Sequence, residues 1–375
     1  MLNHIFIIQL NIYGVNFFMS KLNIGIICGG NSSEHTVSLS SAETISKFIS
    51  KEKYNVYYIG ITKDGKWYLL GNRKYILDDS DWETNPDNQP AVISPDTNTK
   101  GLIIKNENKL DTIKLDAVIP VLHGKNGEDG SVQGLLQLSG IPVVGCDMVS
   151  SAACMDKVIT NTMLTFNGIN KAKFHWFTKY DFEKNPEKCV SETEIALKKY
   201  PMFVKPSKAG SSVGISKALN KEELINAIKI AAKEDEKILV EEAIVGKEVE
   251  CAVLGNNELI ASTVGEISPS GDFYDYESKY ISGDSGLHIP ARINNETAKE
   301  IRGAAKKAFK IMGCKGLSRV DFFVEDKTNK VLLNEINTFP GFTEISMYPK
   351  LIEKSGYPLP KLIDKLIELA IEKEL

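Results

Sequence analysis

The sequence predicts an α/β fold, with a mainly parallel sheet in its first part. Apolar segments at 22–28, 54–61 and 116–124 are typical of buried strands. Helical patterns at 38–49 and 131–140 follow the first and the third of them. Buried strands that alternate with helices indicate a parallel sheet covered on both faces. At about 150 residues per domain, a chain of 375 residues corresponds to two or three domains.

The first 20 residues stand apart from this pattern. Residues 1–18 are apolar, but no basic segment precedes them and no small-residue cleavage site follows, which argues against a signal peptide. Polar side chains such as Asn3 and Gln9 interrupt them, which makes them a poor membrane span. We expect translation to begin at Met19 and residues 1–20 to lie outside the fold. The alternative is a peripheral helix or a membrane-surface segment.

The first structural unit is predicted to cover residues 21–147. After the strand at 54–61 comes a short strand at 66–70, and then a polar, turn-rich stretch at 71–113 with weak strands at best. The buried strand at 116–124 and the helix that follows close the unit.

The second unit is predicted to cover residues 148–241. A single helix at about 151–167 ends at Gly168, a residue type that often terminates helices. The remaining expected elements are strands at 174–177 and 202–206, a helix at 221–234 and a strand at 238–244.

The third unit is predicted to cover residues 242–375. Antiparallel strands are expected at 248–255 and 258–267, followed by a polar, aromatic segment at 270–290. An amphipathic helix at 296–312 precedes a hairpin of strands 316–325 and 330–337, and a last helix fills 360–373.

Composition excludes several classes of protein. The 45 basic and 49 acidic side chains leave a net charge of −4, so no strong field favours nucleic acid or a membrane surface as a partner. No apolar run outside the first residues reaches the ~20 residues of a membrane-spanning helix. The six cysteines include no Cys-x-x-Cys pair, which argues against a zinc ribbon and favours the cytoplasm. Arginine is scarce, so each one raises the question of its role.

The hairpin at 316–337 is the clearest candidate site. Glu335 and Asn337 lie two apart and therefore share one face of their strand, and a turn near 327–328 places Asp321 opposite Glu335. Such oxygen ligands suit Mg²⁺ together with phosphate oxygens. Arg319 lies on the same face, where it could stabilise an oxyanion. The alternative is a solvated polar face of an edge hairpin.

A glycine- and serine-rich loop follows the strand that ends at Lys205. In KPSKAGSSVGI (205–215), small residues would let backbone N–H groups approach phosphates. The loop does not match G-x-x-x-x-G-K-[ST], so it is not a Walker A motif. The alternative is an ordinary turn.

Two further loops follow buried strands. In HGKNGEDGSVQG (123–134), His123 precedes glycines and a helix N-terminus that can face an anion. A metal site there is one interpretation; we favour the other, in which Glu128 and Asp129 cap the helix and bond within the loop. In GGNSSEH (29–35), Glu34 precedes a helix, whose dipole its charge could simply complement.

Seven motifs together resemble the D-alanine–D-alanine ligases of the ATP-grasp superfamily. They occur in the family's order over residues 21–375: GGNSSEHTVSLSSA (29–42), HGKNGEDGSVQG (123–134), SSAACMDK (150–157), VKPSKAGSSVGIS (204–216), FYDYESKY (273–280), RVDFF (319–323) and NEINTFPGF (334–342). The resemblance implies a three-domain ATP-grasp fold, in which an N-terminal parallel α/β domain precedes two subdomains that clamp the nucleotide.

The resemblance also implies a reaction. ATP would phosphorylate the carboxylate of one D-alanine, and the amine of a second would displace phosphate, giving D-alanyl-D-alanine for peptidoglycan precursors. The implied cofactors are ATP and two Mg²⁺ ions (or Mn²⁺), and the implied assembly is a homodimer. The alternative is a D-alanine–D-serine ligase of the same family. Ser346 and Met347 would face the second amino acid, and an apolar Met347 favours the methyl group of D-alanine.

The resemblance assigns nucleotide contacts to five residues. Lys157 and Lys205 would contact phosphates, Glu241 and Glu248 would hold the adenine amine and the ribose, and Lys279 would reach the γ-phosphate from a closing loop.

Five more residues are assigned to the reacting groups. Asp321, Glu335 and Asn337 would bind the two metal ions. Arg319 and the backbone N–H of Gly341 would stabilise the tetrahedral oxyanion.

Four residues are assigned to the first substrate and the loop above it. Glu34 would bind the ammonium group of the first D-alanine, with His123 near its carboxylate. Ser211 and Tyr280 would join Glu34 in a hydrogen-bond network that orders the closing loop.

Overall fold

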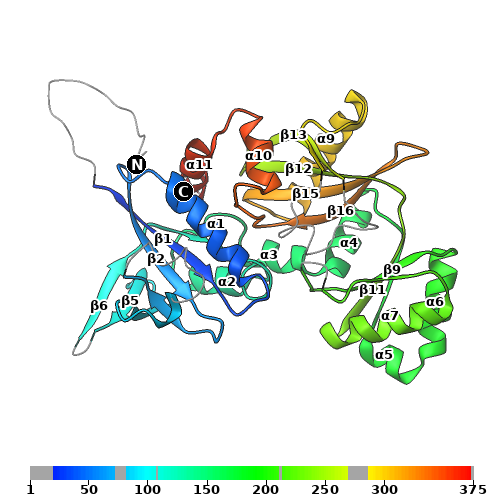
Figure 1. Ribbon diagram of the computed structural model, residues 1–375, viewed down its shortest axis with the longest axis horizontal. Helices are drawn as coiled ribbons and strands as arrows, with labels where there is room; N and C mark the ends of the chain where they lie inside the picture. The colour runs from blue at the N-terminus through cyan, green and yellow to red at the C-terminus, as the bar shows by residue number, and fades with distance from the viewer. Residues whose placement is uncertain (1–19, 72–81, 107–108, 211–212, 269–285, 373–375) are drawn as a thin grey trace, which may run out of the picture.

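The computed structural model describes residues 20–71, 82–106, 109–210, 213–268 and 286–372 (Figure 1). Within these ranges the chain builds three sheets, and along the long axis of the molecule the third sheet lies between the first and the central one (Figure 1). The N-terminal extension and most of the polar segment predicted at 270–290 lie outside the described residues. No helix among the described residues combines the length and the apolar character needed to cross a bilayer.

The first sheet has seven strands in the order β6-β5-β4-β3-β2-β1-β7. Its strands are β1 (Leu22–Gly29), β2 (Tyr54–Ile61), β3 (Trp67–Leu69), β4 (Gln89–Ile93), β5 (Gly101–Lys105), β6 (Leu110–Lys114) and β7 (Ala117–Pro120). Within this sheet only the pairs β1–β2 and β1–β7 are parallel. The expectation of a mainly parallel sheet is therefore wrong for the remaining strands, which form an antiparallel meander.

This meander occupies the stretch where weak strands at best were expected. β6 alternates between exposed and half-buried residues and β4 begins with two exposed ones, so their sequences lack the apolar runs that mark buried strands. Helices α1 (His35–Phe48) and α2 (Ser131–Leu138) follow β1 and β7, and a short 3₁₀ turn, η2 (Trp82–Thr84), precedes β4.

The central sheet has the order β10-β9-β11-β8 and is fully antiparallel. Its elements are β8 (Phe174–Thr178), α5 (Lys179–Lys184), α6 (Pro186–Leu197), β9 (Met202–Pro206), β10 (Ser216–Ala218), α7 (Lys221–Glu234) and β11 (Lys237–Glu242). Helices α5 and α6 were not predicted, although both carry start signals. Thr178 and Asp181 form a capping box, and Asn185 with Pro186 starts the second helix.

The third sheet has the order β14-β13-β12-β15-β16. Its elements are β12 (Gly246–Gly255), β13 (Ile260–Ser268), β14 (Gly286–His288), α9 (Asn295–Ile311), β15 (Gly316–Glu325), β16 (Val331–Asn337), α10 (Met347–Glu353) and α11 (Leu359–Glu372). The predicted hairpin of β15 and β16 is confirmed, and Asp321 pairs with Glu335 as its register required.

The helix expected at 151–167 is two helices, α3 (Met148–Met155) and α4 (Lys157–Phe166). Asp156 separates them with φ −85° and ψ 101°, outside the helical region. Its carboxylate accepts hydrogen bonds from the backbone N–H groups of Val158 and Ile159, from Ser207 Oγ at 2.6 Å and from Lys237 Nζ at 2.7 Å. The break thus fastens the start of α4 to the central sheet.

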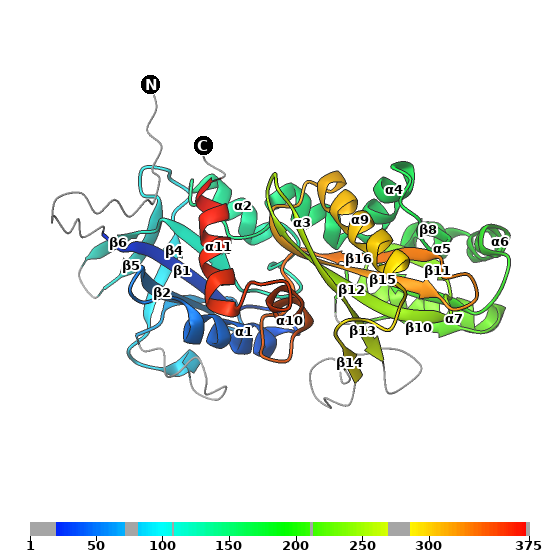
Figure 2. The same ribbon diagram turned by 90° about the horizontal axis from the view of Figure 1, so that it is seen from above.

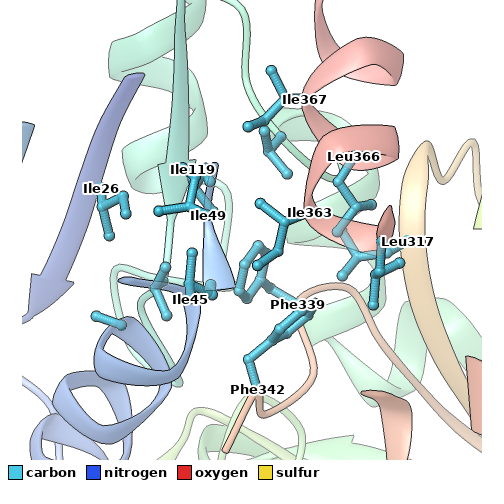
Figure 3. Packing of buried hydrophobic residues seen from close by; sticks show 14 of the residues in the cluster. Ile26, Ile45, Ile49, Ile119, Leu317, Phe339, Phe342, Ile363, Leu366 and Ile367 are labelled. Carbon is cyan, nitrogen blue, oxygen red and sulfur yellow. The ribbon is translucent and has the colours of Figure 1, made fainter. Parts of the chain in front are cut away.

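The last helix does not pack on its own sheet alone. It crosses the junction between the first and the third sheets (Figure 2) and contacts α1, β7 and β15. Side chains from α1, β1 and β7, such as Ile45, face Ile363 and the aromatic pair Phe339 and Phe342 in one apolar cluster (Figure 3). The first and third units therefore share a core.

We expect Asp156→Ala to lower the free energy of unfolding by about 2–3 kcal/mol, because a helix cap and charge-assisted bonds are lost together. Urea unfolding measures this. The control is Asp64→Ala, which removes an exposed ion pair to Lys66 and should cost less. Equal losses in the two variants would contradict a structural role for Asp156.

Candidate functional site

One cleft of about 770 Å³ gathers loop residues of the first unit with residues from the strands and loops of the central and third units. Thirteen of the predicted site residues line it: Glu34, His123, Lys157, Lys205, Glu241, Glu248, Arg319, Asp321, Glu335, Asn337, Gly341, Ser346 and Met347. The other three, Ser211, Lys279 and Tyr280, lie outside the described residues. Segments more than 300 residues apart in sequence, at 34 and 341–347, thus meet on one surface.

The centre of the cleft is an ion cluster on the β15–β16 hairpin. Arg319 donates from Nε and Nη2 to the two carboxylate oxygens of Asp321, each at 2.8 Å. Its Nε also lies 3.0 Å from Glu250 Oε2, and Asn337 Nδ2 donates to Asp321 at 2.9 Å. Burial opposes the charge of the guanidinium, but Asp321 and Glu250 hold the pKa of Arg319 well above its ordinary value.

The predicted metal ligands provide two carboxylates and one amide. Among the described residues, no three His, Cys, Asp or Glu side chains come together as a metal-binding group. Asp321 and Glu335 face each other across the ladder, and Asn337 follows on the same strand. These hard oxygen donors fit Mg²⁺ when phosphate oxygens complete its coordination, as is common for this ion. In this arrangement Asp321 would have to share its oxygens between the ion and Arg319.

A second group of charges lies on the central sheet. Lys205 Nζ on β9 lies 2.6 Å from Glu241 on β11, and Asn161 Nδ2 on α4 donates to the same carboxylate at 2.8 Å. Burial works against both charges, but their attraction raises the pKa of Lys205 and lowers that of Glu241. Lys157, the first residue of α4, donates from Nζ to the carbonyl of Ala209 at 2.7 Å. Both lysines therefore border the loop that begins after β9.

The N-terminal side of the cleft presents Glu34, which is 6% exposed. A Cβ on Gly124, where φ is +69°, would lie 2.5 Å from Glu34 Oε2, so only glycine allows this approach. A Cβ on Gly210 would lie 3.2 Å from the same oxygen, which brings the glycine-rich loop of the central unit against Glu34.

The loop that follows His123 uses its acidic residues internally. Glu128 accepts from Gly124 N–H at 2.8 Å, and Asp129 accepts from the N–H groups of Asn126 and Ser131. The expected hydrogen bonds within the loop are confirmed for both residues, whereas the bond to the first residue of α2 comes from Asp129 and not from Glu128. Burial, reinforced by the negative charge of Glu34, raises the pKa of Glu128 to about 8.

His123 is a neutral group in this environment, because burial lowers its pKa. Its Nε2 lies 3.1 Å from Ser41 Oγ, and that hydroxyl accepts from Phe342 N–H. The histidine is thereby connected to the 339–342 loop, which also carries Gly341.

The 341–347 segment is closely packed at its two ends. A Cβ on Gly341 would lie 2.9 Å from Ser346 Oγ, and that hydroxyl lies 2.7 Å from Thr343 Oγ1. Met347, 5% exposed, starts α10, and its Sδ lies 2.9 Å from the position of a Cβ on Gly265. Ile345, between these ends, is 55% exposed.

Sequence reasoning missed Glu250, the second carboxylate partner of Arg319. The signal was present, because Glu248 and Glu250 are two apart on β12 and must share a face. The strand was predicted, and Glu248 was assigned to the site, but the side-chain alternation that places Glu250 on the same face was not used.

Comparisons with known proteins agree with this arrangement. Residues 23–146 match the family model described as D-ala D-ala ligase N-terminus, and residues 163–368 match D-ala D-ala ligase C-terminus. The D-alanine–D-alanine ligase of Caldicellulosiruptor bescii is 49% identical over 95% of this chain and 96% of its own length. That of Acetivibrio thermocellus is 48% identical over 94% and 96%.

Solved structures are similar over nearly the whole chain. The VanG D-Ala:D-Ser ligase from Enterococcus faecalis has a TM-score of 0.85 and 43% identity, and the match covers 94% of this chain and all of that one. The D-alanine-D-alanine ligase from Coxiella burnetii has a TM-score of 0.82 and 37% identity, with 94% and 96% covered.

We expect Arg319→Ala to lower the free energy of unfolding by about 3–5 kcal/mol, because two buried carboxylates, Asp321 and Glu250, lose their counter-ion. Arg319→Lys keeps a positive charge but loses the planar guanidinium that donates two parallel hydrogen bonds. Its free energy of unfolding should therefore lie between those of the wild type and Arg319→Ala. Urea unfolding measures both. Arg302→Ala, which loses one hydrogen bond to the Ala261 carbonyl, is the control. If Arg319→Ala is as stable as this control, the guanidinium does not hold the cluster together.

Proposed function

The chain belongs to the D-alanine–D-alanine ligase family, and from this premise we propose how its cleft joins two D-alanines at the expense of ATP. The ATP-dependent ligation is the activity of its relatives in the family. The observation that carries the assignment of roles is that the Arg319 cluster, Lys157, Lys205 and the acidic Glu34 line one cleft. A cation for oxyanions thus shares this cleft with candidate sites for a polyphosphate and for an ammonium group.

The nucleotide is proposed to bind between the central and third sheets. Lys157 and Lys205 would contact its phosphates, and Glu241 and Glu248 would bind the adenine amine and the ribose hydroxyls. Lys279 would reach the γ-phosphate from the segment that follows β13. Since Lys205 is paired with Glu241, its charge is held at the cleft wall before any phosphate arrives.

The first D-alanine is proposed to bind with its ammonium group at Glu34 and its carboxylate near His123. A neutral His123 adds no positive charge that would hold this carboxylate back from phosphoryl transfer. The carboxylate oxygen attacks the γ-phosphorus of ATP, the bond to the bridging oxygen breaks, and ADP leaves. Ser211 and Tyr280 would extend the hydrogen bonds of Glu34.

The second step forms the peptide bond. The neutral amine nitrogen of the second D-alanine attacks the acyl carbon, releases one proton to solvent and keeps the other as the amide hydrogen, and phosphate departs with the electrons of the broken C–O bond. Arg319 and the N–H of Gly341 would stabilise the oxyanion that forms between these events. Two Mg²⁺ (or Mn²⁺) ions held by Asp321, Glu335 and Asn337 would supply charge neutralisation for the phosphates.

Ser346 and Met347 are proposed to bind the second D-alanine. The similarity to the VanG D-Ala:D-Ser ligase keeps D-serine as the second candidate. Met347 argues for D-alanine, because its closely packed thioether offers no hydrogen-bond partner for a hydroxymethyl group beyond a weak acceptor.

Two broader statements belong to the same proposal. We place the unit divisions at 147/148, between the first and the central sheet, and at 241/242, at the last residue of β11. We also place the enzyme in the cytoplasm, where ATP is available and where six free cysteines would stay reduced.

Product analysis tests the proposed function. With ATP, Mg²⁺ and equal D-alanine and D-serine, we expect D-alanyl-D-alanine to exceed D-alanyl-D-serine by about tenfold or more, the scale of discrimination in a small apolar pocket. Mass spectrometry identifies the dipeptides, and release of ADP should require D-alanine. A dominant D-alanyl-D-serine product would favour the alternative, and absence of turnover with both amino acids would refute ligation.

Metal dependence tests the hairpin ligands. We expect Glu335→Gln to raise the Mg²⁺ concentration needed for half-maximal rate by at least about tenfold. Mutation of a residue that only hydrogen-bonds to a metal ligand already lowers metal affinity or activity by about tenfold or more. The control is Asp326→Asn in the turn of the same hairpin, which should leave the requirement unchanged. An unaltered Mg²⁺ requirement in Glu335→Gln would place the metal elsewhere.

A homodimer is the proposed assembly, with an interface along α2, α3 and α4. These helices follow one another along one side of the molecule (Figure 2) and expose large apolar side chains. The exposed residues are Leu138, Val149, Ile159, Met163 and Phe166, the last of which is 88% exposed. An apolar patch of this kind marks interaction sites.

We expect Phe166→Lys to shift the protein from dimer to monomer, because a charge replaces an apolar contact in the interface. Sedimentation velocity measures this. Tyr180→Lys, at an exposed aromatic residue of α5, is the control and should remain dimeric. A monomeric wild type, or a dimer unaffected by Phe166→Lys, would contradict this interface.

A further inference from the structure

Lys171 connects the central unit to the edge of the third sheet. It lies between α4 and β8, and it forms a parallel bridge with Leu333 of β16. The N–H of Leu333 donates to the Asn170 carbonyl at 2.9 Å, and Lys171 Nζ donates to the Asn334 carbonyl at 2.5 Å. The short segment thus covers the outer edge of the strand that carries Glu335 and Asn337.

The charges around Lys171 come from both sides of the cleft, the central unit and the third sheet. Glu241 on β11 and Glu335 on β16 favour its ammonium form, while Lys205 on β9 and Lys157 on α4 oppose it. Enclosure by the protein dominates and lowers the pKa of Lys171 to about 8. A cation in such surroundings costs free energy, which is difficult to explain for a residue that only fills space.

Lys171 does not itself line the cleft, whereas its neighbour Ala172 and its hydrogen-bond partner Asn334 do. Its effect on a ligand must therefore pass through the residues it holds. The backbone of β16 on one side and the carboxylate of Glu241 on the other are the groups it influences.

We propose that Lys171 is a positioning residue for the nucleotide. The ammonium group of Lys171 holds β16 against the central unit and thereby sets the distance between these two sides of the cleft, which enclose ATP. The proposal rests on the proposed function, since it takes the cleft to be the ATP site. It predicts an effect on ATP binding rather than on D-alanine binding, because Glu34 and the 341–347 segment lie on other elements.

The test uses the full chain with Lys171→Met, Lys171→Arg and a matched control. We expect Lys171→Met to raise KM for ATP and the ATP dissociation constant from calorimetry by roughly tenfold, the scale of one hydrogen bond from a charged group. KM for D-alanine should change less than about twofold. Lys171→Arg, which keeps the charge and a donor, should recover most of the loss.

Lys173→Met is the control, because Lys173 is an exposed lysine two residues further along the same segment. It should leave every constant unchanged. Should Lys171→Met fail to fold by circular dichroism, Lys171→Gln takes its place under the same criteria.

Two results would overturn the proposal. One is an ATP dissociation constant in Lys171→Met equal to that of Lys173→Met, whatever its stability. The other is an equal rise in KM for ATP and for D-alanine, which indicates general loosening. Failure of the function itself looks different, because then the wild type would neither bind ATP nor form a dipeptide.

Discussion

The paired charges of Arg319, Asp321 and Glu250 are the interaction on which the site depends. A guanidinium that is 18% exposed is tolerable because two carboxylates compensate it, Asp321 on its own strand β15 and Glu250 on the neighbouring β12. The same pairs fix the direction of its fork and bring Asn337 into contact with Asp321. Because Asp321 faces Glu335 across the ladder, the cluster also determines where oxygen ligands gather. The ion pairs of Arg319 and the pairing of β15 with β16 therefore favour the same arrangement of side chains at the hairpin.

A common pattern governs the rest of the cleft. Among the described residues, the two lysines proposed to contact phosphates are already held by protein acceptors, Lys205 by Glu241 and Lys157 by the Ala209 carbonyl. Side chains held in this way need little reorganisation when a ligand arrives, which is the physical basis of preorganised electrostatic stabilisation. Backbone glycines complete the pattern, since Gly124 lets one loop approach Glu34 without a side chain between them.

Much of this arrangement could be predicted from the sequence, because it depends on local periodicity. The β15–β16 register followed from alternation together with a turn placed near 327–328, and the motifs in order indicated the family before any contact was known. What could not be predicted depends on tertiary context. The break at Asp156 is decided by Ser207 and Lys237, which are 51 and 81 residues away. The weakly apolar meander of β4 to β6 shows no pattern until its strands pair.

The shared core of Figure 3 has a consequence for biosynthesis. Ile363 and Leu366 belong to the last helix, yet they pack against Ile45 and Ile119 of the first unit. A growing chain emerges from the ribosome N-terminus first, so the first unit must wait for almost the entire polypeptide before its apolar face is covered. Synthesis of α11, rather than completion of the first unit, is therefore the event that allows the native core to form.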